Sequence, residues 1–240
     1  MTNLLFIMLT FDRLQYTKEA VSALLKNDSD FHLTLFDNGS TEPGMREYLE
    51  HLPETDDRVI DVHSAGKNLG LSIPTNMLWK QYRDVYPFIG KIDNDTLIPP
   101  DGVKRIMDVM SACPNIHICH GHHWLAENFK PRRLKEIDGR VHLTAKWGGG
   151  CFYVMRSSII DDLGYISDKH GLMGGWTRYQ IRARRRGYGI VYAYPLIKVR
   201  HLGDPDSGRE EETGAYRDYN EYIRKHRTAD FSSPGQPVDE

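Results

Sequence analysis

Short apolar segments alternate with amphipathic ones along the first part of the chain. Four apolar segments have the length and composition of buried β-strands: Leu4–Leu9, Phe31–Phe36, Val59–His63 and Phe88–Ile92. Apolar side chains recur at helical spacing in the segments between them: Tyr16–Lys26, Gly44–Leu52 and Ile73–Tyr82. This alternation predicts βαβ units, and therefore an α/β fold with a central, mostly parallel sheet flanked by helices.

The rest of the chain contains the same kinds of segment in a less regular order. Further helices are predicted at Gly102–Ser111, Ser158–Leu163, Tyr179–Arg186 and Ala215–His226. Further strands are predicted at Asn115–His120, Cys151–Met155, Ile190–Tyr194 and Ile197–Val199. The basic stretch Glu127–Leu143 is predicted to be irregular. No linker separates these segments, so we expect one domain over residues 1–227 and a disordered polar tail over residues 228–240.

Composition narrows the class of protein. Of the 240 residues, 40% are apolar and 27% are charged, as expected of a globular protein with a large core. The formal net charge of −2 provides no general attraction to nucleic acid or to anionic membranes. The first apolar segment is too short to cross a bilayer, so no transmembrane segment is predicted. Cys113, Cys119 and Cys151 form no C-x-x-C pattern, which favours reduced thiols and a cytoplasmic location.

Polar residues occur in the loops that follow three of the predicted strands. Asp37, Asn68 and Asp93 lie in the loops after the second, third and fourth strands. Ligands of open parallel sheets bind beyond the carboxyl ends of the strands, so these residues are expected to face one crevice. Asp93 and Asp95 are two residues apart and can therefore point to the same side. Paired carboxylates suit Mn²⁺ or Mg²⁺, although an isolated D-x-D pattern is more often a simple turn.

A late histidine adds to the aspartate pair. His201 ends an apolar strand just before a glycine, where an imidazole could reach the same crevice and complete a site for a divalent cation. Other chemistry is excluded or disfavoured. Gly66-Lys67-Asn68 lacks the hydroxyl residue of a P-loop, and no G-x-G-x-x-G follows the first strand. The cysteines and histidines between Cys113 and His123 do not have zinc-finger spacing.

The order of seven short motifs resembles the nucleotide-sugar-dependent glycosyltransferases of the GT-A fold, specifically family 2. The motifs are Leu9-Thr10-Phe11-Asp12-Arg13, Asp37-Asn38-Gly39-Ser40-Thr41, Asn68-Leu69-Gly70 with Asn76, Asp93-Asn94-Asp95, Gly149-Gly150-Cys151-Phe152, Arg182–Tyr188 and His201-Leu202-Gly203. They extend from the first strand to Gly203. The resemblance implies a GT-A domain with a central, mostly parallel mixed sheet. It also implies that the domain transfers a sugar from a nucleotide-diphosphate donor, with UDP-sugars favoured.

The resemblance also implies roles for individual residues. Thr10, Asp37 and Asn68 would contact the nucleotide, and Asp93 would face the ribose and a metal-bound water. Asp95 and His201 would ligate Mn²⁺ or Mg²⁺, with Asp93 beside them in the metal site. Gly149 and Gly150 would let the donor sugar approach the backbone, with Trp176 as a platform for a sugar ring, although a tryptophan is more often part of the core.

One departure from the family concerns the catalytic base. Inverting members carry a Glu-Asp pair where this chain has Gly175-Trp176, and no carboxylate occurs between Gly171 and Gly187. Asp162 or Asp168 could substitute as the base, the enzyme could retain the anomeric configuration, or the protein could bind the nucleotide-sugar without turnover. We favour retention. A sugar nucleotidyltransferase is a further alternative, since it also requires paired aspartates and a metal.

The acceptor is not identified by the sequence. Two basic groups, Lys130-Arg132-Arg133-Lys135 and Arg178-Arg182-Arg184-Arg185-Arg186, are most simply solvated surfaces. Their alternative role is to bind an anionic acceptor, such as a phosphorylated glycan, a lipid headgroup or a nucleic acid.

Overall fold

A computed structural model describes residues 2–123, 133–144, 147–170 and 175–203. Its strands are β1 (Leu4–Thr10), β2 (His32–Asp37), β3 (Val59–Ser64), β4 (Phe88–Asp93), β5 (Thr96–Leu97), β6 (Ile116–His120), β7 (His122–His123), β8 (Arg133–Ile137), β9 (Arg140–Thr144), β10 (Phe152–Arg156), β11 (Gly189–Tyr192) and β12 (Lys198–His201). Its helices are α1 (Leu14–Leu25), α2 (Met45–Thr55), α3 (Ser72–Tyr82), α4 (Gly102–Ala112), α5 (Ser158–Leu163), α6 (Gly175–Arg185) and the 3₁₀ turn η2 (Asp168–His170).

Within the described residues, nine strands form one sheet in the order β3-β2-β1-β4-β10-β6-β11-β9-β8. The first four strands in this order are mutually parallel. β10 runs antiparallel to both of its neighbours, β4 and β6, so the sheet is mixed, as predicted. Three short strands, β5, β12 and β7, form a second small sheet, in which β12 pairs antiparallel with β5.

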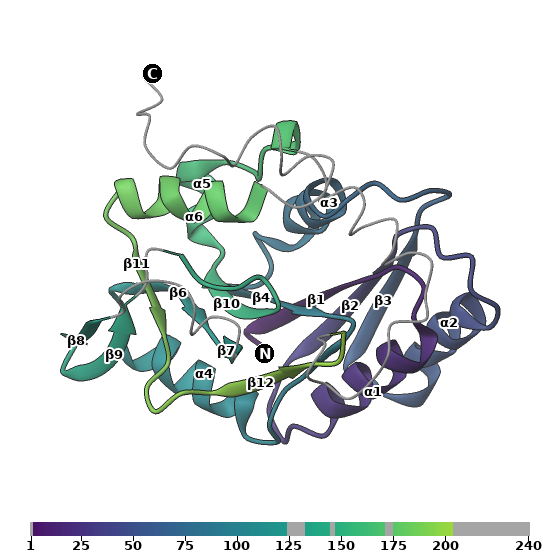
Figure 1. Ribbon diagram of the computed structural model, residues 1–240, viewed down its shortest axis with the longest axis horizontal. Helices are drawn as coiled ribbons and strands as arrows, with labels where there is room; N and C mark the ends of the chain where they lie inside the picture. The colour runs from purple at the N-terminus through teal and green to yellow at the C-terminus, as the bar shows by residue number, and fades with distance from the viewer. Residues whose placement is uncertain (1, 124–132, 145–146, 171–174, 204–240) are drawn as a thin grey trace. The chain divides into compact units, whose positions relative to one another are not determined.

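Helices cover both faces of the large sheet (Figure 1). α1, α2 and α4 pack on one face over a core that includes Phe6, Phe31 and Phe152. α3, α5 and α6 pack on the other face, where Trp79 and Tyr179 are fully buried. Every residue of β1 is buried, because this strand lies in the middle of the parallel part and has a core on each side.

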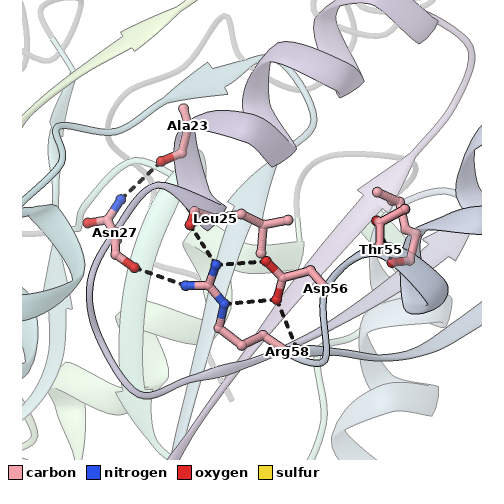
Figure 2. Close-up of polar contacts among 7 residues, drawn as sticks. Ala23, Leu25, Asn27, Thr55, Asp56 and Arg58 are labelled. Atoms are coloured by element: carbon pink, nitrogen blue, oxygen red, sulfur yellow. Dashed lines mark hydrogen bonds and ion pairs between the residues drawn. The ribbon is translucent and has the colours of Figure 1, made fainter.

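Arg58 joins several elements at the end of the sheet where β3 begins (Figure 2). Its guanidinium donates hydrogen bonds to the backbone carbonyls of Leu25 (2.6 Å) and Asn27 (3.0 Å), at the C-terminal end of α1. It also forms an ion pair with Asp56 (2.8 Å) and lies over the ring of Phe31. The carbonyls at the end of α1 have no partner within the helix, so Arg58 caps this helix from a distant part of the chain.

Most predicted elements are confirmed to within a few residues, and the exceptions are one hairpin, three short elements and the start of α6. The described part of the basic stretch is not irregular: β8 and β9 form a hairpin around Asp138 and Gly139, whose φ angles are +52° and +76°. An Asp-Gly pair with both angles positive is a favoured two-residue hairpin turn. β5, β7 and η2 were not predicted, and α6 begins at Gly175 rather than at Tyr179.

Several expectations lie outside the described residues. The predicted helix over 215–226, the tail over 228–240 and the basic residues Lys130 and Arg132 belong to this group. The described chain up to Leu202 forms one compact unit. No helix within the described residues combines the length and the apolar content that crossing a membrane requires.

Candidate functional site

The carboxyl ends of three adjacent parallel strands bring the predicted donor-binding residues to one edge of the sheet. Thr10, the last residue of β1, pairs with Asp37, the last residue of β2. On the other side of β1, Leu9 pairs with Asp93 at the end of β4. Thr10 and Asp37 are buried, whereas Asp93 is partly exposed. The register therefore places all three residues side by side, as the loop positions predict.

The aspartate pair and the late histidine come together at this edge. Asp93, Asp95 and His201 each offer a ligand atom, and these atoms lie within 4.8 Å of one another. His201 Nε2 lies 3.1 Å from Asp95 Oδ1. The short pairing of β12 with β5 produces this contact, because it sets His201 opposite Thr96, and the Leu202 amide donates to the Asp95 carbonyl at 2.6 Å.

Each aspartate also contacts a cationic side chain, and neither contact was predicted from the sequence. Arg13 donates a hydrogen bond to Asp95 Oδ2 at 2.6 Å, and the Lys91 amine contacts Asp93 Oδ1 and the carbonyl of Gly150 (3.3 Å). Burial by itself would raise the pKa of Asp95, but His201, Arg13 and Lys91 together hold it below its usual value. A signal for Lys91 was present in the sequence, since it is the one charged residue within the apolar segment Phe88–Ile92.

The loop that carries Arg13 is held in an unusual conformation. Asp12 and Arg13 both have left-handed backbone angles, with φ of +48° and +62°. The Asp12 carboxylate accepts hydrogen bonds from the amides of Thr41 (2.7 Å) and Glu42 (2.9 Å). Such angles are costly for non-glycine residues and persist only where several contacts hold them. The β2 loop thus fixes the turn from which Arg13 reaches Asp95.

A network of side-chain amides joins the loops after β2 and β3. The buried Asn38 amide donates to Asn68 Oδ1 (3.0 Å) and to the Gly70 carbonyl (2.9 Å), and it accepts from the Leu69 amide (2.8 Å). The Asp37 carboxylate accepts hydrogen bonds from the backbone and hydroxyl of Ser40. Asn68 therefore lies beside Asn38, the residue after Asp37, and its side-chain oxygen is used to shape the loop.

The glycine turn before β10 reaches the same edge. The Lys91 amine contacts both Asp93 and Gly150, so the turn lies beside the aspartate pair. A Cβ at Gly150 would lie 3.5 Å from Trp176, the second residue of α6. Trp176 stacks on Tyr153 with ring centroids 4.1 Å apart. Gly149, Gly150 and Trp176 are thus adjacent, and Trp176 also contributes to the core.

The two candidate bases occupy different places. Asp162 accepts hydrogen bonds from Arg186 and the Tyr188 hydroxyl, both 2.9 Å, beyond the C-terminal end of α6. Trp176 near the start of α6 lies against Gly150, whereas Asp162 contacts residues just beyond the other end of this helix, which is about 16 Å long. The structure therefore does not bring Asp162 to the aspartate pair. Asp168 begins η2, and the preceding residue Ser167 lies against Gly175 at the start of α6.

The chemistry of the cluster fits a divalent metal ion. Two carboxylates and an imidazole are suitable ligands for Mn²⁺ or Mg²⁺, and ligand atoms within 4.8 Å of one another could share one ion. Arg13 contacts the second oxygen of Asp95, which leaves the first oxygen directed toward His201.

Solved structures with the same fold are glycosyltransferases of the GT-A type. A mannosyltransferase from Pyrobaculum calidifontis, in complex with GDP-Man and Mn²⁺, is 12% identical with a TM-score of 0.68, over 85% of this chain and 58% of its own. S. aureus TarS 1–349 with UDP-GlcNAc is 14% identical with a TM-score of 0.60, over 93% and 65%. GalNAc-T7 with UDP, GalNAc and Mn²⁺ is 10% identical with a TM-score of 0.68, over 83% and 43%.

This chain spans less than two thirds of each of these three chains, and identities this low establish the fold alone. No curated protein sequence matches the chain. The sequence pattern of glycosyl transferase family 2, in contrast, matches residues 5–170, which include the edge residues Thr10, Asp37 and Asp93. As this match covers more than half of the chain, the protein belongs to glycosyl transferase family 2.

Proposed function

We propose that the protein is a metal-dependent glycosyltransferase that uses a nucleotide-diphosphate sugar, with a UDP-sugar as the donor. The observation that carries this proposal is the grouping of Asp93, Asp95 and His201 at the carboxyl edge of the sheet, next to Thr10 and Asp37. Family membership and the nucleotide complexes of the structural neighbours support it.

The proposal gives each part of the edge a role. Thr10, Asp37 and Asn68 bind the nucleotide, and Asp93, Asp95 and His201 hold Mn²⁺ or Mg²⁺. The ion would neutralise the negative charge that develops on the diphosphate as the sugar leaves. Gly149 and Gly150 allow the sugar close to the backbone, with Trp176 beside it. Lys91 adds a positive charge between Asp93 and the glycine turn.

Deprotonation of the acceptor distinguishes two forms of this proposal. The start of α6 carries Gly175 and Trp176 where inverting relatives are expected to have carboxylates. We favour a retaining reaction, in which the leaving phosphate accepts the proton of the acceptor hydroxyl. Asp168 is the base that an inverting reaction would use, since Asp162 lies at the far end of α6.

The decisive experiment measures release of UDP from a panel of UDP-sugars with Mn²⁺, with and without glycan acceptors. We expect UDP to form, and to stop forming when Mn²⁺ is chelated. Asp95→Asn removes one charge from the metal site, so we expect it to abolish the thermal stabilisation that UDP with Mn²⁺ gives the wild type. Asp161→Asn, which changes an exposed carboxylate on α5, is the matched control and should behave as wild type.

The alternatives predict different products. Binding of UDP-sugars without release of UDP from any donor and acceptor pair would favour a nucleotide-sugar-binding protein, which the missing carboxylates of α6 also permit. Pyrophosphate formed from a nucleoside triphosphate and a sugar phosphate would indicate a nucleotidyltransferase. Unchanged metal-dependent binding in Asp95→Asn would contradict the metal site.

The proposal also includes the acceptor and the location in the cell. We propose a cytoplasmic enzyme whose acceptor is a glycan or an anionic molecule. The described basic residues Arg133 and Lys135 on β8, and the arginines of α6, provide the positive charge for such an acceptor.

A further inference from the structure

The glycine turn, residues Gly148 to Gly150, is held by side chains from three separate elements. Gln180 of α6 contacts Gly148, the Tyr192 hydroxyl of β11 accepts a hydrogen bond from the Gly149 amide (3.2 Å), and Lys91 of β4 donates to the Gly150 carbonyl. None of these three side chains belongs to the motifs that identify the family. Each successive backbone unit of the turn thus has its own polar partner.

Gln180 makes the most complete of these contacts. Its side chain is fully buried, and its amide accepts from the Gly148 N–H at 2.7 Å and donates to the Gly148 carbonyl at 3.0 Å. Because the backbone supplies one donor and one acceptor, the orientation of the Gln180 amide is determined. Both hydrogen-bonding groups of Gly148 are therefore satisfied by one side chain, in a place that water does not reach.

His120 fixes Gln180 in turn. The fully buried His120 ring places Nε2 3.0 Å from Gln180 Oε1, and since this oxygen is an acceptor, Nε2 must carry the proton. A Cβ on Gly148 would overlap the His120 ring, so the turn packs directly against the imidazole. The three residues form a small polar unit inside an otherwise aromatic part of the core, where Trp176 and Tyr153 also contact His120.

We propose that Gln180 is a positioning residue that fixes the position of the glycine turn against the donor sugar. It thereby determines how well the sugar part of the donor binds. This inference rests on the proposed function, in which the sugar lies against Gly149 and Gly150. The nucleotide part is bound at the ends of β1 and β2, which Gln180 does not contact. Loss of Gln180 should therefore weaken the sugar contact and leave the nucleotide contact intact.

The test compares dissociation constants for UDP and for UDP-GlcNAc, both with Mn²⁺, by calorimetry. GDP and GDP-mannose provide a second pair of probes. Gln180→Met keeps the length and burial of the side chain but removes all its hydrogen bonds to the turn. We expect the affinity for the nucleotide-sugar to fall about tenfold, with the affinity for the free nucleotide within about twofold of wild type.

Two further variants test whether a general loss of stability could explain the change in affinity. Tyr192→Phe removes a different contact to the same turn, without changing the shape of the ring, and should shift the ratio of the two dissociation constants in the same direction. Ile160→Val lowers the stability of the same core without contacting the turn, so it should leave the ratio unchanged.

The outcomes separate this inference from the proposed function. Equal losses for nucleotide and nucleotide-sugar in Gln180→Met, or no loss for either, would overturn the role of Gln180 while the proposed function stands. If the wild type binds none of the four probes with Mn²⁺, the proposed function fails, and the inference fails with it. A selective loss in both Gln180→Met and Tyr192→Phe supports the inference.

Discussion

Asp93 and Asp95 are each paired with a cationic side chain, and the two cations come from different parts of the chain. Lys91 pairs with Asp93 from the same strand, whereas Arg13 reaches Asp95 across 82 positions of sequence. The grouping of Asp93, Asp95 and His201 could be predicted from strand ends and motif order. The Arg13 contact could not, because it depends on a left-handed turn that the β2 loop holds in place.

A buried histidine gives the protein a specific response to acid. Burial lowers the pKa of His120 to about 4 from an ordinary value of 6.5, although its hydrogen bond with Gln180 acts in the opposite direction. Between these values the unfolded chain takes up a proton at His120 that the folded chain does not. The contribution of His120 to stability is therefore complete above pH 6.5 and decreases as the pH falls toward 4.

The measurement is urea unfolding of wild type and His120→Gln as a function of pH. Glutamine can still donate a hydrogen bond to Gln180, but it cannot take up a proton. We expect the free energy of unfolding of the wild type to fall by about 3 kcal/mol more than that of the variant as the pH is lowered from neutral to about 4. Parallel pH curves for the two proteins would show that folding does not lower the pKa of His120.

At the scale of elements, periodicity predicted the long helices and strands but missed elements that depend on partners. The hairpin β8–β9 had a local signal in Asp138-Gly139 that the basic composition obscured. The two residues of β5 are too few for any periodicity, and they form a strand because β12 pairs with them. The start of α6 at Gly175-Trp176 has weak helical propensity, and packing of Trp176 on Tyr153 outweighs it.

The contacts of Arg58 predict that one side chain holds α1 to the end of the sheet. Arg58→Ala removes the donors to the Leu25 and Asn27 carbonyls and leaves Asp56 without its cation. Because hydrogen bonds from a charged donor are stronger than neutral ones, we expect the free energy of unfolding to fall by about 2 kcal/mol, measured by urea denaturation.

Arg46→Ala is the matched control for this variant. Arg46 pairs with Glu50 within α2, and both side chains are exposed to solvent. Its removal should cause no measurable change, since exposed ion pairs contribute little. Equal effects of the two substitutions would mean that Arg58 acts as an ordinary surface charge.

At the scale of the whole molecule, α6 packs on one face of the sheet, and the length of the helix separates its two ends. The start of the helix faces the glycine turn, and its end carries Arg186 and Tyr188 with Asp162. The parallel direction of β3, β2, β1 and β4 follows from the predicted βαβ units. The insertion of β10 between β4 and β6 could not be predicted, because an apolar strand such as Phe152–Arg156 carries no signal of its direction.

This arrangement predicts how the two candidate bases behave on substitution. Asp162→Asn should leave kcat for sugar transfer within about twofold of wild type, because this carboxylate lies a helix length from the glycine turn. In the retaining reaction that we favour, Asp168→Asn should also keep kcat within about tenfold, and the product should keep the configuration of the donor sugar.

The product configuration is measured by NMR during the first turnovers, alongside the kinetics of both variants. An inverted product together with a loss of kcat of about 100-fold or more in Asp168→Asn alone would replace this scheme with an inverting one. A comparable loss in Asp162→Asn would contradict the separation of the two ends of α6.

The antiparallel strand β10 has a consequence for synthesis of the protein. β4 is buried between β1 and β10, yet the chain that completes its second edge is made about 60 residues later. At typical translation rates this leaves the edge of β4 open for about 3 to 12 seconds on the ribosome. The backbone of β4 is unpaired at that edge during this interval, and open strand edges invite pairing with other chains. The strand that carries the aspartates therefore stays incompletely paired on the ribosome until β10 has been made.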